Sequence, residues 1–285
     1  MLKVLKTLIT ASFLVASLAF AFQQEPVIAK VDSRVNTVVI DAGHGGKDPG
    51  TRGRTTKEKD VALAVALELG RQIKEETPNV KVLYTRSTDV FIELGERSAF
   101  ANRNNADLFI SIHCNALPDK TIRERIGTKK GKAVYKSTRV VDRSGKGVLM
   151  LVYGLKRTGE QQREIKSNQV SEEIDGEADP NDPVTIILTN EYLRRFRQKS
   201  ITLANILADE FVTVDGRRLE GIREQSLNVL VHTAMPSVLV EIGYITNLEE
   251  EEYLNSEKGQ EEIVATIVRS IQAYKLQVEK TVIKN

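Results

Sequence analysis

The chain has 285 residues, of which 41% are hydrophobic and 28% charged, and these proportions exclude a collagen-like, low-complexity or wholly disordered protein. Aromatic residues make up 5% and Trp is absent, so aliphatic side chains must fill the core. The 41 basic and 39 acidic residues give a net charge of +2, which is not the strong basic excess of a nucleic-acid-binding protein.

The first 21 residues have the pattern of a secretory signal peptide. Lys3 and Lys6 precede an apolar run from Leu8 to Phe20, and Ala19-Phe20-Ala21 fits a cleavage site. We therefore expect a signal peptide over 1–21, a short leader over 22–35, and an exported, periplasmic protein without a stable membrane anchor. An uncleaved anchor is the alternative, although the apolar run is short for a membrane span.

Strands and amphipathic helices alternate through the next part of the chain. Apolar periodicity predicts strands over 37–40, 80–85 and 107–113, and helices over 58–76 and 94–104. This alternation is typical of an α/β domain with a largely parallel sheet.

The second half of the chain is less regular at first. After a strand expected over 131–137, we interpret residues 138–184 as an insertion, because the segment is rich in Gly and poor in apolar periodicity. A long helix over 185–212 and strands over 227–231 and 237–241 follow. Asn247 is expected to cap a short helix, with Glu250 completing a capping box, and a last helix over 260–274 precedes a polar tail at 276–285.

The first segment with chemical information is VVIDAGHGGKDPG, residues 38–50. It is not a nucleotide-binding loop, because Asp48 stands where one phosphate-binding pattern needs Ser or Thr and where the dinucleotide pattern needs Gly. What remains is His44 at the carboxyl end of a strand, where open α/β sheets place ligands.

Three side chains from separate elements are expected at this edge of the sheet. His113 ends another buried strand, and Glu58 begins the first amphipathic helix. Together with His44 they match the two imidazoles and one carboxylate of a catalytic zinc site with an open position. The alternative, which spacing alone leaves open, is that both His residues are satisfied by hydrogen bonds and that Glu58 is a favourable charge at a helix N-terminus.

Glu241 closes the apolar strand of MPSVLVEIGYITN, residues 235–247. A carboxylate at such an edge suits the general base of a zinc hydrolase. Its alternative role is that of a partner for an Arg side chain or for backbone amides.

The sequence blocks AGHGGKDPG, EKDVAL, YTR, ANRNNADLFISIHCNA and MPSVLVEIGYITN occur in order over residues 36–275. They resemble the zinc-dependent N-acetylmuramoyl-L-alanine amidases. The resemblance implies a single domain with a mixed, twisted sheet flanked by helices, Zn²⁺ bound by His44, Glu58 and His113, and Glu241 as the catalytic carboxylate. It also implies cleavage of the amide between N-acetylmuramic acid and L-alanine in peptidoglycan, for cell-wall remodelling or daughter-cell separation. A zinc peptidase acting within the stem peptide and a wall-binding or activator protein without activity are the alternatives.

Three positions complicate this resemblance. Cys114 stands where Ala is usual and Val231 where many relatives carry Arg. His232 could line the cleft, replace Glu58 as a ligand, or lie at a surface strand end. Because a zinc site supplies its own nucleophile, we do not expect Cys114 to act as one.

Two charged segments carry further hypotheses. Relatives with an insertion often use one of its helices to cover the metal until an activator protein removes it. Glu172 and Glu173, in the acidic stretch 171–182, are the candidate autoinhibitory ligands; a solvated loop is the alternative. The basic cluster around Gly127 and Gly131 is expected in a loop, either as a solvated turn or as a contact for stem-peptide carboxylates; it comprises Arg123, Arg125, Lys129, Lys130 and Lys132.

Overall fold

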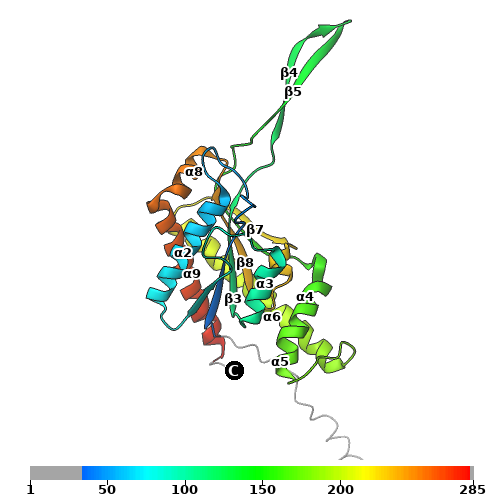
Figure 1. Ribbon diagram of the computed structural model, residues 1–285, viewed down its shortest axis with the longest axis vertical. Helices are drawn as coiled ribbons and strands as arrows, with labels where there is room; N and C mark the ends of the chain where they lie inside the picture. The colour runs from blue at the N-terminus through cyan, green and yellow to red at the C-terminus, as the bar shows by residue number, and fades with distance from the viewer. Residues whose placement is uncertain (1–33, 283–285) are drawn as a thin grey trace, which may run out of the picture.

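The computed structural model describes residues 34–282, so the expected signal peptide and most of the leader lie outside the described residues. A six-stranded sheet in the order β2-β1-β3-β8-β6-β7 forms the centre of the chain (Figure 1). β1, β2, β3 and β8 are parallel, whereas β6 runs antiparallel to β8 and parallel to β7. The strands are β1 (Thr37–Ala42), β2 (Lys81–Tyr84), β3 (Leu108–Asn115), β6 (Val148–Tyr153), β7 (Leu219–Gln225) and β8 (Ser237–Tyr244).

Helices cover both faces of this sheet, which confirms the expected fold class. One face packs against α2, α6 and α9 and the other against α3 and α7. The helices are α2 (Glu58–Glu76), α3 (Leu94–Arg103), α6 (Pro183–Thr213), α7 (Asn228–Val231), α8 (Leu248–Asn255) and α9 (Glu257–Val282). Among residues 34–282, none of the helices combines the length and apolar composition of a membrane span.

The apolar pattern explains how α2 meets the sheet. Its residues Val61, Val65, Leu69 and Ile73 recur every four positions and are all buried. Burial of each such side chain contributes about 1.5–3 kcal/mol relative to exposure. The helix therefore has a fixed orientation, with its first residue, Glu58, at the edge of the sheet where β1 and β3 end.

The range 138–184 is not an insertion throughout, because it contains the core strand β6. All six residues of β6 are buried, and Leu149 lies opposite Glu241 of β8. A strand buried on both faces shows a continuous apolar run instead of alternation, which is why periodicity misses it. Outside the sheet the range holds a helical segment that comprises η1 (Leu155–Arg157), α4 (Thr158–Ile165), the π-helix η2 (Lys166–Val170) and α5 (Ser171–Glu173).

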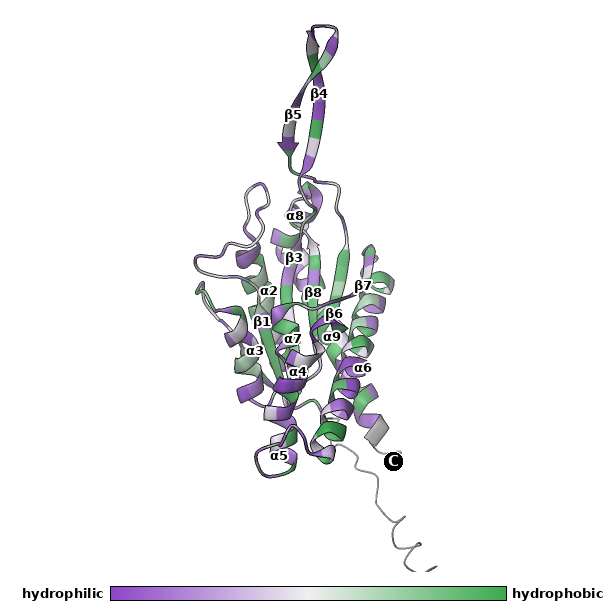
Figure 2. Cartoon of the chain, turned by 90° about the vertical axis from the view of Figure 1, so that its right-hand side faces the viewer, coloured by the Kyte–Doolittle hydropathy of each residue, from purple (hydrophilic) through white to green (hydrophobic). Residues whose placement is uncertain are grey.

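The basic cluster was expected in a loop, and this prediction is wrong. Strands β4 (Lys120–Lys129) and β5 (Lys132–Val140) form a separate antiparallel ribbon that projects beyond the rest of the described chain (Figures 1 and 2). Lys130 and Gly131 connect the strands with φ angles of 50° and 75°, the positive values that tight hairpin turns require.

Three other predictions change near the end of the chain. The strand expected over 227–231 is the short helix α7, and α9 continues to Val282, so most of the expected polar tail is helical. Asn247 does cap α8, because its side chain accepts hydrogen bonds from the backbone N–H groups of Glu249 and Glu250. The Glu250 carboxylate accepts from Tyr244 N–H instead of completing a capping box.

Candidate active site

His44, Glu58 and His113 meet at the edge of the sheet where β1 and β3 end. The two imidazole centroids lie 4.9 Å apart. Glu58 Oε1 is 3.1 Å from His44 Nε2 and 2.8 Å from His113 Nδ1. Within residues 34–282 these three form the one group of His, Cys or carboxylate side chains that could hold a metal ion, with one ligand atom from each within 4.8 Å of the others.

Two glycines make this close approach feasible. A Cβ atom on Gly43 would lie 2.4 Å from the His113 ring, and one on Gly50 would lie 2.6 Å from Glu58 Oε2. Gly50 also has a φ of +63°, a conformation that side chains disfavour. His44 itself has a φ of 60°, so the loop holds it in an uncommon backbone conformation.

The charges within the group are strongly coupled. Burial alone would raise the pKa of Glu58, but hydrogen bonds with His113 and His44 hold this pKa well below its usual range. Burial alone would lower the pKa of His44, whereas hydrogen bonds with Glu58 and Asp48 raise it to about 9. The group thus contains an ionised carboxylate, and a metal ion that binds His44 would displace a proton from its imidazole.

Backbone and carboxylate groups orient these side chains. Asp48 Oδ2 lies 2.7 Å from His44 Nδ1, which leaves His44 Nε2 directed at the group. The N–H groups of Thr51 and Cys114 donate to the Glu58 carboxylate at 2.8 and 3.0 Å. Carboxylates bound to the second nitrogen of a ligating His are usual in metal sites. Sequence reasoning missed this role of Asp48, although its spacing of four residues from His44 was a usable signal.

Two buried arginines hold the loop that carries His44. Arg86 donates to the carbonyl oxygens of Ala42 and Gly43, each at 2.8 Å. Arg97 donates to the carbonyl of His44 at 2.6 Å and to the buried carboxylate of Asp41 at 2.7 Å. The guanidinium of Arg97 counteracts the effect of burial and lowers the pKa of Asp41. Sequence reasoning also missed both arginines.

Glu241 lies beside the group on the neighbouring strand. In the register of β3 and β8 it is the partner of His113. Its Oε2 atom is buried and has no hydrogen-bond partner among the described residues. Burial raises the pKa of Glu241 to about 7, with a further upward contribution from the charge of Glu58. Such a carboxylate can gain and lose a proton near neutral pH.

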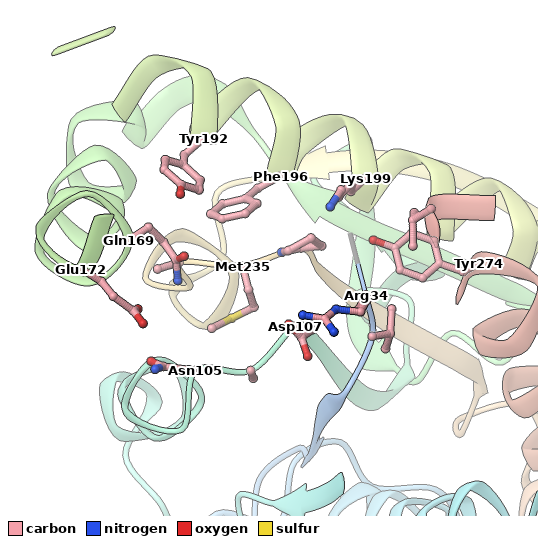
Figure 3. A pocket seen from close by; sticks show the side chains of 15 residues that line it. Arg34, Asn105, Asp107, Gln169, Glu172, Tyr192, Phe196, Lys199, Met235 and Tyr274 are labelled. Atoms are coloured by element: carbon pink, nitrogen blue, oxygen red, sulfur yellow. The ribbon is translucent and has the colours of Figure 1, made fainter. Parts of the chain in front are cut away.

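The candidate autoinhibitory residues lie near the opposite end of the sheet, where β3 and β8 begin. Glu172 lines a cavity together with Asp107 and Pro236, which directly precede β3 and β8 (Figure 3). Glu173 accepts a hydrogen bond from the Tyr192 hydroxyl at 2.6 Å. Neither belongs to the group formed by His44, Glu58 and His113.

His232 and Cys114 are not parts of the metal group either. His232 follows the short helix α7 and not a strand, so the expected strand-end position is wrong. Its Nδ1 atom lies 3.2 Å from Glu164 of α4 and its Nε2 atom 3.5 Å from Glu160, away from the metal group. Cys114 is buried, and burial raises the pKa of its thiol well above the usual value. Both facts disfavour a nucleophilic role.

Comparison with known proteins identifies the family. The N-acetylmuramoyl-L-alanine amidase family matches residues 38–273. The chain belongs to this family. It is 29% identical over 248 residues to the N-acetylmuramoyl-L-alanine amidase AmiC of Escherichia coli O6:H1, a match that covers 83% of this chain and 52% of AmiC, so it spans about half of that relative.

Solved structures of the same family share the fold. The amidase AmiC2 of Nostoc punctiforme has a TM-score of 0.58 and 26% identity over 85% of this chain and 97% of its own. The catalytic domain of CwlV, an amidase from Bacillus (Paenibacillus) polymyxa var. colistinus, has a TM-score of 0.58 and 27% identity, covering 85% of this chain and 99% of its own. The resemblance carried by the sequence blocks is thereby confirmed.

Proposed function

We propose that this protein is an exported, Zn²⁺-dependent enzyme that hydrolyses the amide between N-acetylmuramic acid and L-alanine in peptidoglycan. The observation that carries the proposal is the convergence of His44, Glu58 and His113 beside the unpartnered oxygen of Glu241. Membership of the N-acetylmuramoyl-L-alanine amidase family supports the identity of the cleaved bond and of peptidoglycan as the substrate.

The side chains fit zinc by their chemistry. Two imidazoles and one carboxylate are the donor set of catalytic zinc sites that keep a position open. Bound there, the ion would polarise the substrate carbonyl and lower the pKa of a water molecule to about 7. Asp48 orients His44 for this role, and the backbone N–H groups of Thr51 and Cys114 fix Glu58.

Glu241 carries the proton in this reaction. Its carboxylate accepts a proton from the attacking water and delivers it to the nitrogen of the departing L-alanine amine. The position of Glu241 suits both steps, because its buried Oε2 atom has no hydrogen-bond partner among the described residues and burial favours its protonated form.

The test is product analysis with purified peptidoglycan sacculi. An amidase releases stem peptides with a free L-alanine amine, whereas a peptidase leaves L-alanine on the muramic acid, and mass spectrometry separates the two. A chelator should abolish release and Zn²⁺ should restore it. Products cut only within the stem would refute the proposed bond, and activity that survives full metal removal would refute the metal role.

Export and regulation are separate parts of the proposal. Amino-terminal sequencing of the secreted protein should begin after Ala21. In the inhibited state, residues 155–182 would have to leave their place beside α6 and bring Glu172 or Glu173 to the metal group, and an activator would return the segment to the place described above. The double variant Glu172→Gln, Glu173→Gln should then raise the basal rate, and an unchanged rate with normal zinc content would refute autoinhibition by these residues.

A further inference from the structure

The ribbon of β4 and β5 is exposed along its whole length. All ten residues of β4 are exposed, and β5 is nearly as open. At about 3.3 Å per residue, the ribbon reaches roughly 33 Å. Isolated two-stranded ribbons are marginally stable in water, so such an extended arm needs a reason other than stability.

The two faces of the ribbon differ in chemistry. Cross-strand partners share a face, and successive pairs alternate between faces. The pairs Thr121↔Arg139, Arg123↔Ser137 and Arg125↔Tyr135 therefore put three arginines and one tyrosine on the same side, which we term the arginine face. The Arg123 guanidinium lies 5.6 Å from the centre of the Tyr135 ring, as this placement requires.

The arginine face carries no acidic side chain. Glu124 is the one acidic residue among the 21 from Lys120 to Val140, against eight Lys or Arg, and its partner Lys136 lies with it on the opposite face. The whole chain has nearly equal numbers of basic and acidic residues. Positive charge is thus concentrated on the ribbon, and this arrangement favours an anionic ligand.

The base of the ribbon is tied to both strands of the active site. β4 follows β3, which carries His113, along the chain. After β5, the Arg143 guanidinium donates to the carbonyl of Thr246 at 2.8 Å, and Asn247 Nδ2 donates to the carbonyl of Arg143 at 3.1 Å. Thr246 and Asn247 lie just after the end of β8, the strand that carries Glu241. The base of the ribbon is therefore anchored at the end of the sheet that carries the catalytic group, and a polymer bound to the ribbon is tethered to that end of the molecule.

We propose that the arginine face binds the carboxylates of peptidoglycan stem peptides and holds the polymer beside the active site. The inference rests on the proposed function for the identity of the polymer. Guanidinium groups bind carboxylates with two parallel hydrogen bonds, and Tyr135 adds a flat surface for apolar parts of the peptide or sugar. A membrane is the less suitable partner, because the register places the exposed Ile122 on the opposite face from the three arginines.

Two matched variants test this. R123Q/R125Q/R139Q removes three charges from the arginine face, and K129Q/K132Q/K136Q removes three from the opposite face. In co-sedimentation with sacculi, the arginine variant should bind about tenfold more weakly or worse, and the lysine variant within about twofold of the unchanged protein. Sacculi whose carboxylates have been converted to neutral amides should bind the unchanged protein about as weakly as untreated sacculi bind the arginine variant.

Several results would overturn the inference. Equal losses in both variants would show unselective charge attraction, and tighter binding to phosphatidylglycerol vesicles than to sacculi would show a membrane ligand. Zinc content and thermal unfolding should match in all three proteins, which excludes misfolding as the cause. If the unchanged protein binds sacculi through the arginine face but releases no peptide, the proposed function fails while this inference stands.

Discussion

Replacing Glu241 with Gln should abolish hydrolysis and, in metal-free protein, raise the free energy of unfolding above neutral pH. Burial raises the pKa of Glu241 from 4.5 to about 7. Because the folded state binds the proton more tightly than the unfolded state, the native protein loses stability as pH rises from about 4.5 to about 7. At ~1.4 kcal/mol per pKa unit, the loss amounts to about 3 kcal/mol and is complete above pH 7. Glutamine has no proton to release in this range, so the variant is not subject to the loss.

The assay is urea denaturation with a chelator present, at pH 5 and pH 8, for the native protein and the variant. The variant should gain about 2.5 kcal/mol relative to the native protein between these pH values, because part of the loss has already occurred by pH 5. Glu252→Gln, at an exposed position of α8, is the matched control and should show no such gain. With zinc restored, Glu241→Gln should bind the metal normally and release peptides at least about a hundredfold more slowly. An equal stability difference at both pH values would refute the burial argument, and a native rate would refute the catalytic role.

Three further predictions concern the surroundings of the metal group. Gly43→Ala places a methyl group 2.4 Å from the His113 ring, so zinc affinity measured by chelator competition should fall about 10–100-fold; an unchanged affinity would show that the ring can shift freely. Arg97→Leu leaves the buried Asp41 carboxylate without its charged partner and should cost about 3–5 kcal/mol in denaturant unfolding, and a cost under about 1 kcal/mol would contradict the assigned contact. Burial, followed by the charge of Glu58, raises the pKa of the Cys114 thiol, so a thiol reagent at pH 8 should modify it only in urea; rapid modification of the native protein would disprove its inaccessibility.

Local sequence patterns predicted those elements whose side chains have one buried face. The helix expected over 58–76 agrees with α2, because its apolar residues recur at the helical period. The strand expected over 131–137 agrees with β5, but β4 and its pairing with β5 were missed. Both faces of β4 are exposed, so its polar and apolar residues follow no burial pattern, and Lys130-Gly131 is a weaker turn signal than Asn-Gly. Strand β6 was missed because it is apolar throughout.

The site could be predicted in part for a similar reason. His44, Glu58 and His113 each end or begin an element whose pattern is clear, and parallel strands bring such ends to one edge. Asp48 acts through the His44 ring, and Arg86 and Arg97 act through backbone carbonyl groups of the folded loop. No periodicity in the sequence encodes such contacts, because they exist only once the loop has adopted its shape.

The packing of the core fixes the geometry of the proposed catalytic pair. Val240 and Ile242 flank Glu241 and belong to the cluster under α2 and α9, as do Ile112 and Cys114 on either side of His113. Because side chains alternate along a strand, His113 and Glu241 both point away from that cluster, and their register makes them direct neighbours. A shift of either strand by one residue would turn its polar side chain, His113 or Glu241, into the apolar cluster, at a cost far above that of a lost contact. The apolar residues of β3 and β8 therefore hold the ligand and the proton carrier side by side.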